Sequence, residues 1–300
     1  TIAGASAGGM NSVFLGRAIA HDLNFDHLRH HWLIEADVSK LTGNRKKASR
    51  WDKMISKPLI SLLSGKFLGS GSLSAKVKEK LPALLNVWNL KPPFDGKHIL
   101  KLVYGGLKAM GELNEHSLLP RGHRLELFVT LTDFYGYKRT ILLNDPPIIS
   151  EMEHRHNLKF SYFKKPIDSM NTDITSDFDD DGLPALSFAA RATSCFPGAF
   201  PPAQLRETDH FLKERNLSWP AKEGFIKNNF KEYNHSGLNP ELTSFLDGSI
   251  LNNKPFDQAI DAIHDRPAFR EVSRRVIYID PNPERMRLRP TGAPPAMLNT

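Results

Sequence analysis

The sequence predicts a layered α/β domain. Segments whose apolar residues recur at helical spacing are intermixed with short runs rich in β-branched and aromatic residues, and no repeat period is evident. Hydrophobic residues make up 40% of the 300 residues, which is enough for a sizeable core in one large or two modest domains. No stretch approaches the roughly eighteen apolar residues in a row that a membrane span needs.

The first expected element is a helix over residues 9–21. Its apolar side chains recur at helical spacing, as the positions Met10, Val13, Phe14, Ala18 and Ile19 show. Residues 37–120 are also mostly helical in pattern, with loops rich in Gly and Pro. A basic stretch from Lys40 to Lys57 surrounds Trp51 there, and it is either a solvated helix face or a surface that meets anionic lipid.

Strand signals follow in the middle of the chain. Residues 125–136 are rich in β-branched and aromatic side chains, and residues 137–143 are expected to form their hairpin partner. A further strand is expected over residues 158–163. Residues 183–202 then begin as an Ala-rich helix and end in a turn stopped by proline.

The last third is expected to contain an insertion and two short strands. Residues 203–240 are polar with scattered helical pieces, which indicates a helical insertion like the one near 40–120. Residues 243–250 form a short strand that ends in an Asp-Gly turn, and an apolar strand is expected over 276–279. The main domain is therefore predicted to span 1–285, with 286–300 as a linker or tail.

Charge and cysteine content limit the partners and the compartment. The net charge of +7 favours anionic partners such as phospholipid head groups, while no nucleic-acid-binding signature accompanies it. The single cysteine is typical of a reducing compartment, so we expect a cytoplasmic protein, with peripheral membrane contact as an open alternative. The chain starts without Met, inside what looks like a structural element, and is expected to be a segment of a longer protein with further domains.

The first chemical motif is Gly4-Ala5-Ser6-Ala7-Gly8, which fits G-x-S-x-G. A nucleophile on a sharp strand-to-helix turn needs small neighbours, because the backbone there is crowded. The helix that follows points its free N–H groups and positive dipole end at the hydroxyl. The pentapeptide alone also fits an ordinary glycine-rich turn, including one that binds phosphate.

The second motif is "LDGSILNNKPF", in which Asp247 is followed by Gly248. An aspartate at a strand end before glycine can present its carboxylate above the sheet on a tight turn. Asp-Gly by itself indicates only a turn.

Taken together, these segments resemble the patatin-like phospholipase family. Ser6 in G-A-S-A-G-G and Asp247 in D-G-S-I-L-N-N-K-P are similar to its G-x-S-x-G and D-G-G/A motifs. Residues 190–202, "ARATSCFPGAFPP", resemble its A-x-x-A-T/S-x-x-x-P-x-x-F-P-P segment, and residues 127–136 resemble its central strand. The polar insertions are similar to the bacterial patatin-related branch of larger proteins.

The resemblance implies a three-layer α/β/α fold with a mostly parallel central sheet. It also implies a serine lipid acyl hydrolase of phospholipase A or lysophospholipase type, with Ser6 as nucleophile and Asp247 as its base, and with no metal or cofactor. The substrate would be a phospholipid or another acyl-ester lipid. The supporting residues would be Gly4, Ala7, Gly8 and Gly248, with the Ala7 N–H as one oxyanion donor.

Two departures from the family pattern stand out. Ser249 occupies the third position of D-G-G. The glycine-rich oxyanion loop of the family, and most of the first strand, would lie before Thr1 and are therefore expected to be missing from this segment.

Two other functions remain open. An α/β-hydrolase triad would have the order Ser, Asp, His, and His264 is the histidine that follows Asp247. A lipid-binding domain could also keep the fold without catalysis.

Several other features are assigned structural roles. The acidic loop at 176–182 begins like a calcium loop but has Phe188 at position twelve, and His27, His30 and His31 lack a zinc-binding pattern. Cys195 is expected in the core and Asp133 in a turn before Gly136. Residues 58–69 fit equally well a lipid-contacting segment or buried core.

Overall fold

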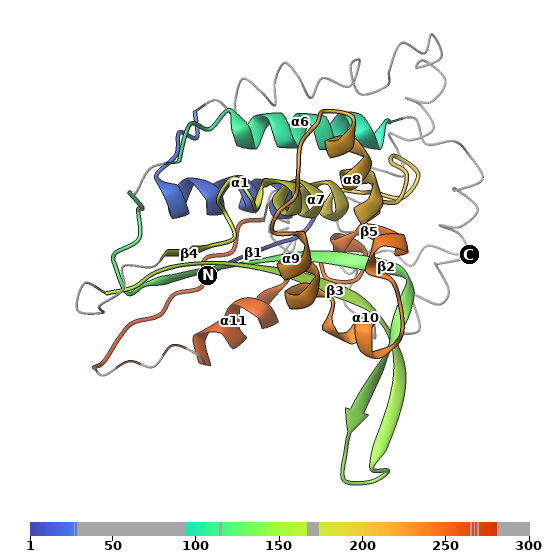
Figure 1. The fold of residues 1–300 in the computed structure, drawn as a ribbon. Helices are drawn as coiled ribbons and strands as arrows, with labels where there is room; N and C mark the ends of the chain where they lie inside the picture. The colour runs from blue at the N-terminus through green and yellow to red at the C-terminus, as the bar shows by residue number, and fades with distance from the viewer. Residues whose placement is uncertain are drawn as a thin grey trace, which may run out of the picture.

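The computed structural model shows a central five-stranded sheet between helical layers (Figure 1). It describes residues 1–26, 28, 94–113, 116–166, 174–264, 266, 268 and 270–280. Several predictions lie outside these residues: the three histidines at 27, 30 and 31, the basic stretch around Trp51, the apolar segment 58–69 and the tail 286–300.

The sheet is built around one long strand. β2 (Arg124–Leu142) pairs along one edge with β3 (Ile148–Lys164), which in turn pairs with β4 (Ile174–Ser176). Along its other edge β2 pairs first with β1 (Ile2–Gly4) and then with β5 (Phe245–Asp247). β1 and β5 therefore lie end to end beside the same strand.

The expected parallel character of the sheet is wrong for the described strands. β1 runs parallel to β2, whereas the pairings of β2 with β3, β2 with β5 and β3 with β4 are antiparallel. A short turn joins β2 directly to β3, and such a connection permits only the antiparallel direction.

The expected hairpin partner at 137–143 is also wrong, because these residues continue β2 and the chain turns back later, between Leu142 and Ile148. The Asp-Phe-Tyr-Gly sequence that indicated a turn forms a register shift between Thr132 and Tyr137. The Asp133 carboxylate accepts hydrogen bonds from the Tyr135 and Gly136 N–H groups there, and Gly136 has φ 76°. A local turn inside a strand produces a bulge and a bend.

The strand predicted over 276–279 does not form. Residues 271–280 have no assigned secondary structure, and Ile277 and Ile279 are both 84% exposed. An apolar run becomes a strand only when a neighbouring strand satisfies its backbone groups, and no strand pairing in the described part of the chain involves this segment.

Helices cover both faces of the sheet (Figure 1). α1, α6 and α7 lie over one face, while α11 lies against the other. The predicted helix at 9–21 is confirmed as α1, and the helix predicted at the start of 183–202 is confirmed as α7, which ends at Thr193 before the turn. The region 203–240 contains short helices, as expected. The helix bounds are α1 (Ala7–His21), α6 (Gly96–Lys108), α7 (Leu183–Thr193), α8 (Leu205–Lys213), α9 (Lys222–Asn229), α10 (Lys231–His235) and α11 (Phe256–His264), with short 3-10 turns at Pro240–Leu242 and Gly248–Ile250.

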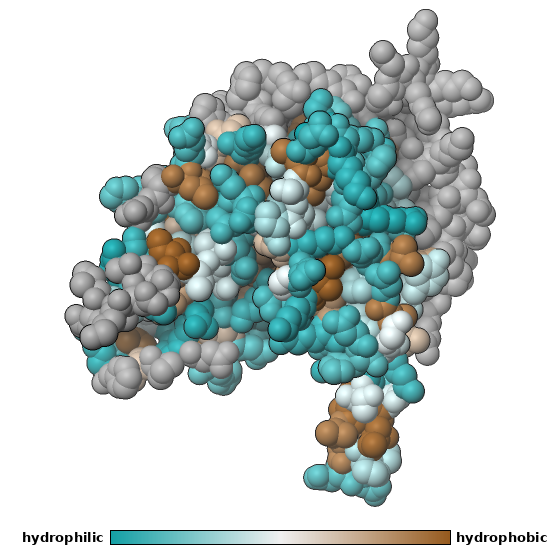
Figure 2. Space-filling view, viewed as in Figure 1, coloured by the Kyte–Doolittle hydropathy of each residue, from teal (hydrophilic) through white to brown (hydrophobic). Residues whose placement is uncertain are grey.

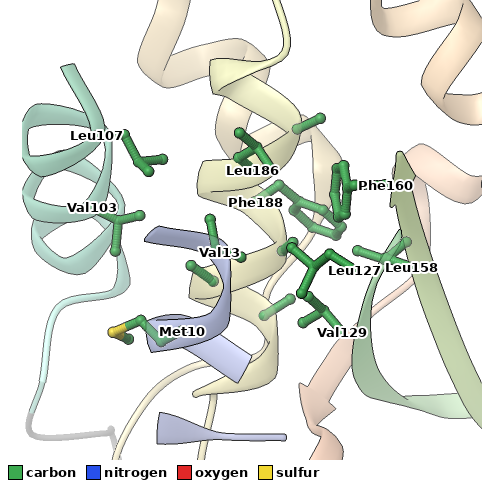
Figure 3. Packing of buried hydrophobic residues seen from close by; sticks show 14 of the residues in the cluster. Met10, Val13, Val103, Leu107, Leu127, Val129, Leu158, Phe160, Leu186 and Phe188 are labelled. Carbon is green, nitrogen blue, oxygen red and sulfur yellow. The ribbon is translucent and has the colours of Figure 1, made fainter. Parts of the chain in front are cut away.

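The core lies between the sheet and the α1, α6 and α7 layer. Every residue of α7 is buried. Figure 3 shows side chains of β2 and β3 pointing toward those of the helices; the labelled residues include Val13, Leu127, Val129, Leu158, Phe160, Leu186 and Phe188. Burying each such side chain contributes about 1.5–3 kcal/mol to the free energy of unfolding. This packing fixes α1, and with it the turn between β1 and α1, against the sheet. Among the described helices, none is both long and apolar enough to cross a bilayer.

Candidate active site

The site lies where two strands point at each other. β1 reaches β2 at Val129, beside Gly4, and β5 arrives from the opposite direction with Asp247 beside Leu131. Thr130 of β2 lies between these two positions. The chain that leaves β1 and the residue that ends β5 are thus brought together, although they are separated by 241 positions in sequence.

Ser6 occupies a strained turn between β1 and α1. Its backbone has φ 54° and ψ −129°, a region that non-glycine residues seldom adopt. Its N–H donates a hydrogen bond of 2.9 Å to the Thr193 hydroxyl oxygen. Helix α1, which starts at Ala7, stabilises this backbone conformation, because its Met10 N–H donates a hydrogen bond of 2.9 Å to the Ser6 carbonyl.

Close packing requires glycine at positions 4 and 9 of the turn, whereas a Cβ on Gly8 would meet nothing within 4 Å. A Cβ on Gly4 would lie 2.7 Å from the Gly8 carbonyl oxygen, and one on Gly9 would lie 2.7 Å from the Thr193 hydroxyl. Ala7 and Gly8 are exposed, and Ser6 is half-buried. The nucleophile candidate is therefore accessible on one side and tightly held on the other.

The Ser6 hydroxyl donates a hydrogen bond of 2.7 Å to Oδ2 of Asp247. It makes no capping hydrogen bond to its own helix. Polar N-terminal residues usually cap the helix that they precede, so the hydroxyl here is turned toward the carboxylate instead. The turn also sits at the positive end of the α1 dipole, which favours negative charge at this position.

Asp247 is 1% exposed and held on every side. Its N–H donates to the Cys195 carbonyl, its carbonyl accepts from the Thr132 hydroxyl, and its Oδ1 accepts from the Ser249 N–H at 2.8 Å. Burial raises the pKa of Asp247 from 3.8 to about 6, against the opposing effect of the hydrogen bonds from Ser6 and Ser249. A carboxylate with that pKa can exchange a proton near neutral pH.

Thr193 was missed as a site residue by sequence reasoning. Its hydroxyl accepts from the Ser6 N–H and donates to the Thr130 carbonyl at 2.9 Å, so it links α7, β2 and the turn. It is fully buried. The signal was present in the "ARAT" segment of the family-like motif, but a hydroxyl in a helix has no visible role until its partners are known.

Gly248 positions the carboxylate side of the site, because it directly follows Asp247. A Cβ there would lie 2.0 Å from the Thr130 carbonyl oxygen and 2.2 Å from the Thr130 hydroxyl oxygen. The Gly248 backbone therefore passes directly against β2, which fixes where Asp247 points. The sequence named Gly248 as a supporting residue, and the close approach supplies a physical reason.

The histidine of the alternative triad lies elsewhere. His264 is exposed at the last residue of α11. The carboxylate contacts the Ser6 hydroxyl directly, so no imidazole stands between the two groups. Cys195 is buried as expected, where burial raises the pKa of its thiol and its Sγ donates to the Pro201 carbonyl.

The carboxylates of the acidic loop at 176–182 pair with N–H groups and an arginine of the protein itself. Asp177 accepts from the Ser161 N–H, Asp179 accepts from the Gly182 N–H, and Asp180 pairs with the buried Arg17 at 2.7 Å. Within the described ranges, no three His, Cys, Asp or Glu residues come together as metal ligands. Asp133 was predicted in a turn before Gly136, but it lies within β2 at the bulge, where its carboxylate also accepts from the Tyr233 hydroxyl at 2.6 Å.

The raised pKa predicts a pH-dependent stability. The pKa of aspartate in the unfolded chain is near 3.8, whereas folded Asp247 keeps its proton up to about pH 6. The folded state binds more protons between these values, so the contribution of this group to stability falls as pH rises through this window. We expect Asp247→Asn to exceed the wild type in free energy of unfolding by about 2–3 kcal/mol at pH 8 and by little at pH 4. Denaturant unfolding at both pH values measures this, and an equal difference at both would contradict it.

Comparisons with known proteins show which family the chain belongs to. A sequence model of the family described as patatin-like phospholipase matches residues 1–260. The uncharacterized membrane protein Rv3479 of Mycobacterium tuberculosis (strain ATCC 25618 / H37Rv) is 34% identical over 103 residues, which cover 34% of this chain and 8% of that protein's length. No solved structure was found to match. Because the family match covers most of the chain, including both Ser6 and Asp247, the chain belongs to the patatin-like phospholipase family.

Proposed function

We propose that the chain is a lipid acyl hydrolase that works through a dyad, with Ser6 as nucleophile and Asp247 as general base. The observation that carries the proposal is the 2.7 Å hydrogen bond from the Ser6 hydroxyl to a buried carboxylate, on a strained turn at a helix N-terminus. Nucleophile and base within hydrogen-bond reach, with the base fixed by further groups, are the general requirements for a covalent route.

The reaction would proceed in two stages. The Ser6 oxygen attacks the ester carbonyl carbon while its proton moves to Asp247, and the tetrahedral intermediate then expels the alcohol, which takes up that proton. The product is an acyl-serine. Water next attacks the acyl carbon, gives its proton to Asp247, and the collapse of the second intermediate releases the fatty acid and returns the proton to Ser6.

The negative oxygen of both intermediates needs a donor. Ala7 is the first residue of α1, directly follows Ser6, and is exposed. We propose its N–H as one oxyanion donor, supported by the helix dipole. A single such donor is worth about 10²–10³ in rate.

Two alternatives receive less support. A triad through His264 would need an imidazole against Ser6, where the carboxylate already lies. A purely lipid-binding domain would have no need to keep a strained serine and a buried carboxylate with a raised pKa, since each of these costs stability. The substrate class we propose is a phospholipid or a related acyl-ester lipid.

The dyad predicts a simple pH profile. Only ionised Asp247 can accept the Ser6 proton, so kcat/KM for a soluble p-nitrophenyl ester is expected to rise about tenfold per pH unit below about pH 6 and to level off above it. The assay uses the full-length protein between pH 4.5 and 9. His264→Ala should keep the profile. A change in kcat/KM with a midpoint near pH 7 that is absent in His264→Ala would instead support the triad.

A further inference from the structure

A two-stranded ribbon projects from the body of the protein. Beyond the bulge, β2 and β3 continue as residues 137–153, which we call the projecting hairpin (Figure 1). All residues from 142 to 152 are exposed. Figure 2 shows a hydrophobic band on the hairpin between its polar tip and the body.

The strand register divides the hairpin side chains between two faces. Side chains alternate along a strand, and directly paired residues share a face. The first face, which we call the apolar face, carries the pairs Lys138 with Met152, Thr140 with Ser150, and Leu142 with Ile148. The opposite face carries Tyr137 with Glu153, Arg139 with Glu151, and Ile141 with Ile149.

The two faces differ in charge and in exposure. On the apolar face, Leu142 is 77% exposed, Ile148 58% and Met152 60%, and the charged residue is a lysine. Both glutamates of the hairpin lie on the opposite face, where Arg139 pairs with Glu153 at 3.5 Å. Three large exposed apolar side chains beside a cation, without a carboxylate, form the pattern of an element that lies in a lipid interface.

We propose that the apolar face of the projecting hairpin binds a phospholipid surface, an inference that rests on the proposed lipid hydrolase function. Leu142, Ile148 and Met152 enter the boundary between head groups and acyl chains. Lys138 extends its apolar stem along them and places its ammonium at lipid phosphates. The hairpin lies along the surface instead of entering tip first, because tip-first entry would bury Asp145, and an unpaired charge is costly to bury.

The position of the hairpin suits a lipid hydrolase. β2 passes Gly4 at Val129 and Asp247 at Leu131, and then continues into the hairpin. The hairpin therefore lies farther along the strand that aligns the Ser6 turn and Asp247, beyond β5 and in the direction in which β1 points. Binding through the hairpin would hold the domain that carries Ser6 and Asp247 at the membrane, where ester lipids are concentrated.

A local fluorescent probe tests which face meets lipid. Leu142→Cys in the full-length protein is labelled with nitrobenzoxadiazole and mixed with vesicles of phosphatidylcholine and phosphatidylglycerol. Glu151→Cys on the opposite face is the matched control, and labelled unsubstituted protein corrects for other cysteines, since Cys195 is buried. We expect a blue shift at position 142 and none at 151. No shift at 142, or an equal shift at both, would overturn the proposal.

A double variant tests the consequence for catalysis. Leu142→Ser with Ile148→Ser should lower hydrolysis of vesicle phospholipid by roughly tenfold or more, because each side chain loses most of its apolar contact. Hydrolysis of a soluble p-nitrophenyl ester should not change. Unchanged hydrolysis of vesicle phospholipid by the double variant would overturn the proposal. So would sedimentation velocity that shows a dimer for the wild type and a monomer for the double variant, while vesicle hydrolysis persists. Absence of soluble-ester hydrolysis in the wild type would instead count against the proposed function.

Discussion

Ser6→Ala is expected to lower kcat/KM for ester hydrolysis by about 10⁴-fold or more, because it removes the atom that forms the covalent bond. Asp247→Asn is expected to cost about 10²–10⁴-fold, the usual range for a general base. The double variant should be no worse than Ser6→Ala alone, since the two residues act as one unit. Steady-state hydrolysis of a p-nitrophenyl ester measures all three.

The matched control for this series is Ser194→Ala. Ser194 is a partly buried serine whose hydroxyl donates to the Ala190 and Arg191 carbonyls of its own helix. It should keep activity within a few-fold of the wild type. Additive losses in the double variant would contradict a dyad, because they would show that Ser6 and Asp247 act independently.

Gly248→Ala is expected to destabilise the protein by about 3 kcal/mol or more, at the upper end of overpacking effects. The added Cβ would lie 2.0 Å from the Thr130 carbonyl oxygen, and β2 cannot move away because it pairs along both edges. Activity should fall as well, since Asp247 directly precedes the displaced residue. Thermal unfolding and ester hydrolysis measure the two effects.

Gly105→Ala provides the opposite case. Gly105 lies inside α6, and its added Cβ would meet nothing within 4 Å. Alanine there should raise the free energy of unfolding by up to about 1 kcal/mol, because glycine is a poor helix residue. Equal effects of the two substitutions would refute the close approach of Gly248 to β2.

The candidate site residues were predicted from the resemblance of two motifs to one family, since each motif alone indicates only a turn. Gly-Ala-Ser-Ala-Gly is compatible with a crowded turn before a helix, and Asp-Gly with a close approach after a strand. Both arrangements are present, at Ser6 and Gly248. Thr193 escaped notice because its role depends on Thr130 and Ser6, which are 63 and 187 positions away.

The errors in the fold share a physical origin. A turn signal such as Asp133 to Gly136 indicates local curvature, but pairing with β3 decides whether the strand reverses or only bends. The apolar run at 276–279 has strand propensity but no strand pairing among the described residues. Sheet direction likewise depends on connections that residue patterns do not contain.

The convergence of β1 and β5 on one neighbouring strand explains how two such short strands can form the site. Both strands have three residues, and each is aligned by the same long neighbour, β2. Thr130, between them, binds the Thr193 hydroxyl and closely contacts Gly248. One residue of β2 therefore sets the positions of the nucleophile turn and the carboxylate together.

The most direct test of the dyad is covalent labelling with a fluorophosphonate, followed by mass spectrometry of the full-length protein. We predict a single adduct on Ser6 that forms rapidly in the wild type, forms at least about 10²-fold more slowly in Asp247→Asn and keeps its rate in His264→Ala. An adduct on another serine, or an Asp247→Asn variant that is labelled as fast as the wild type, would contradict the account.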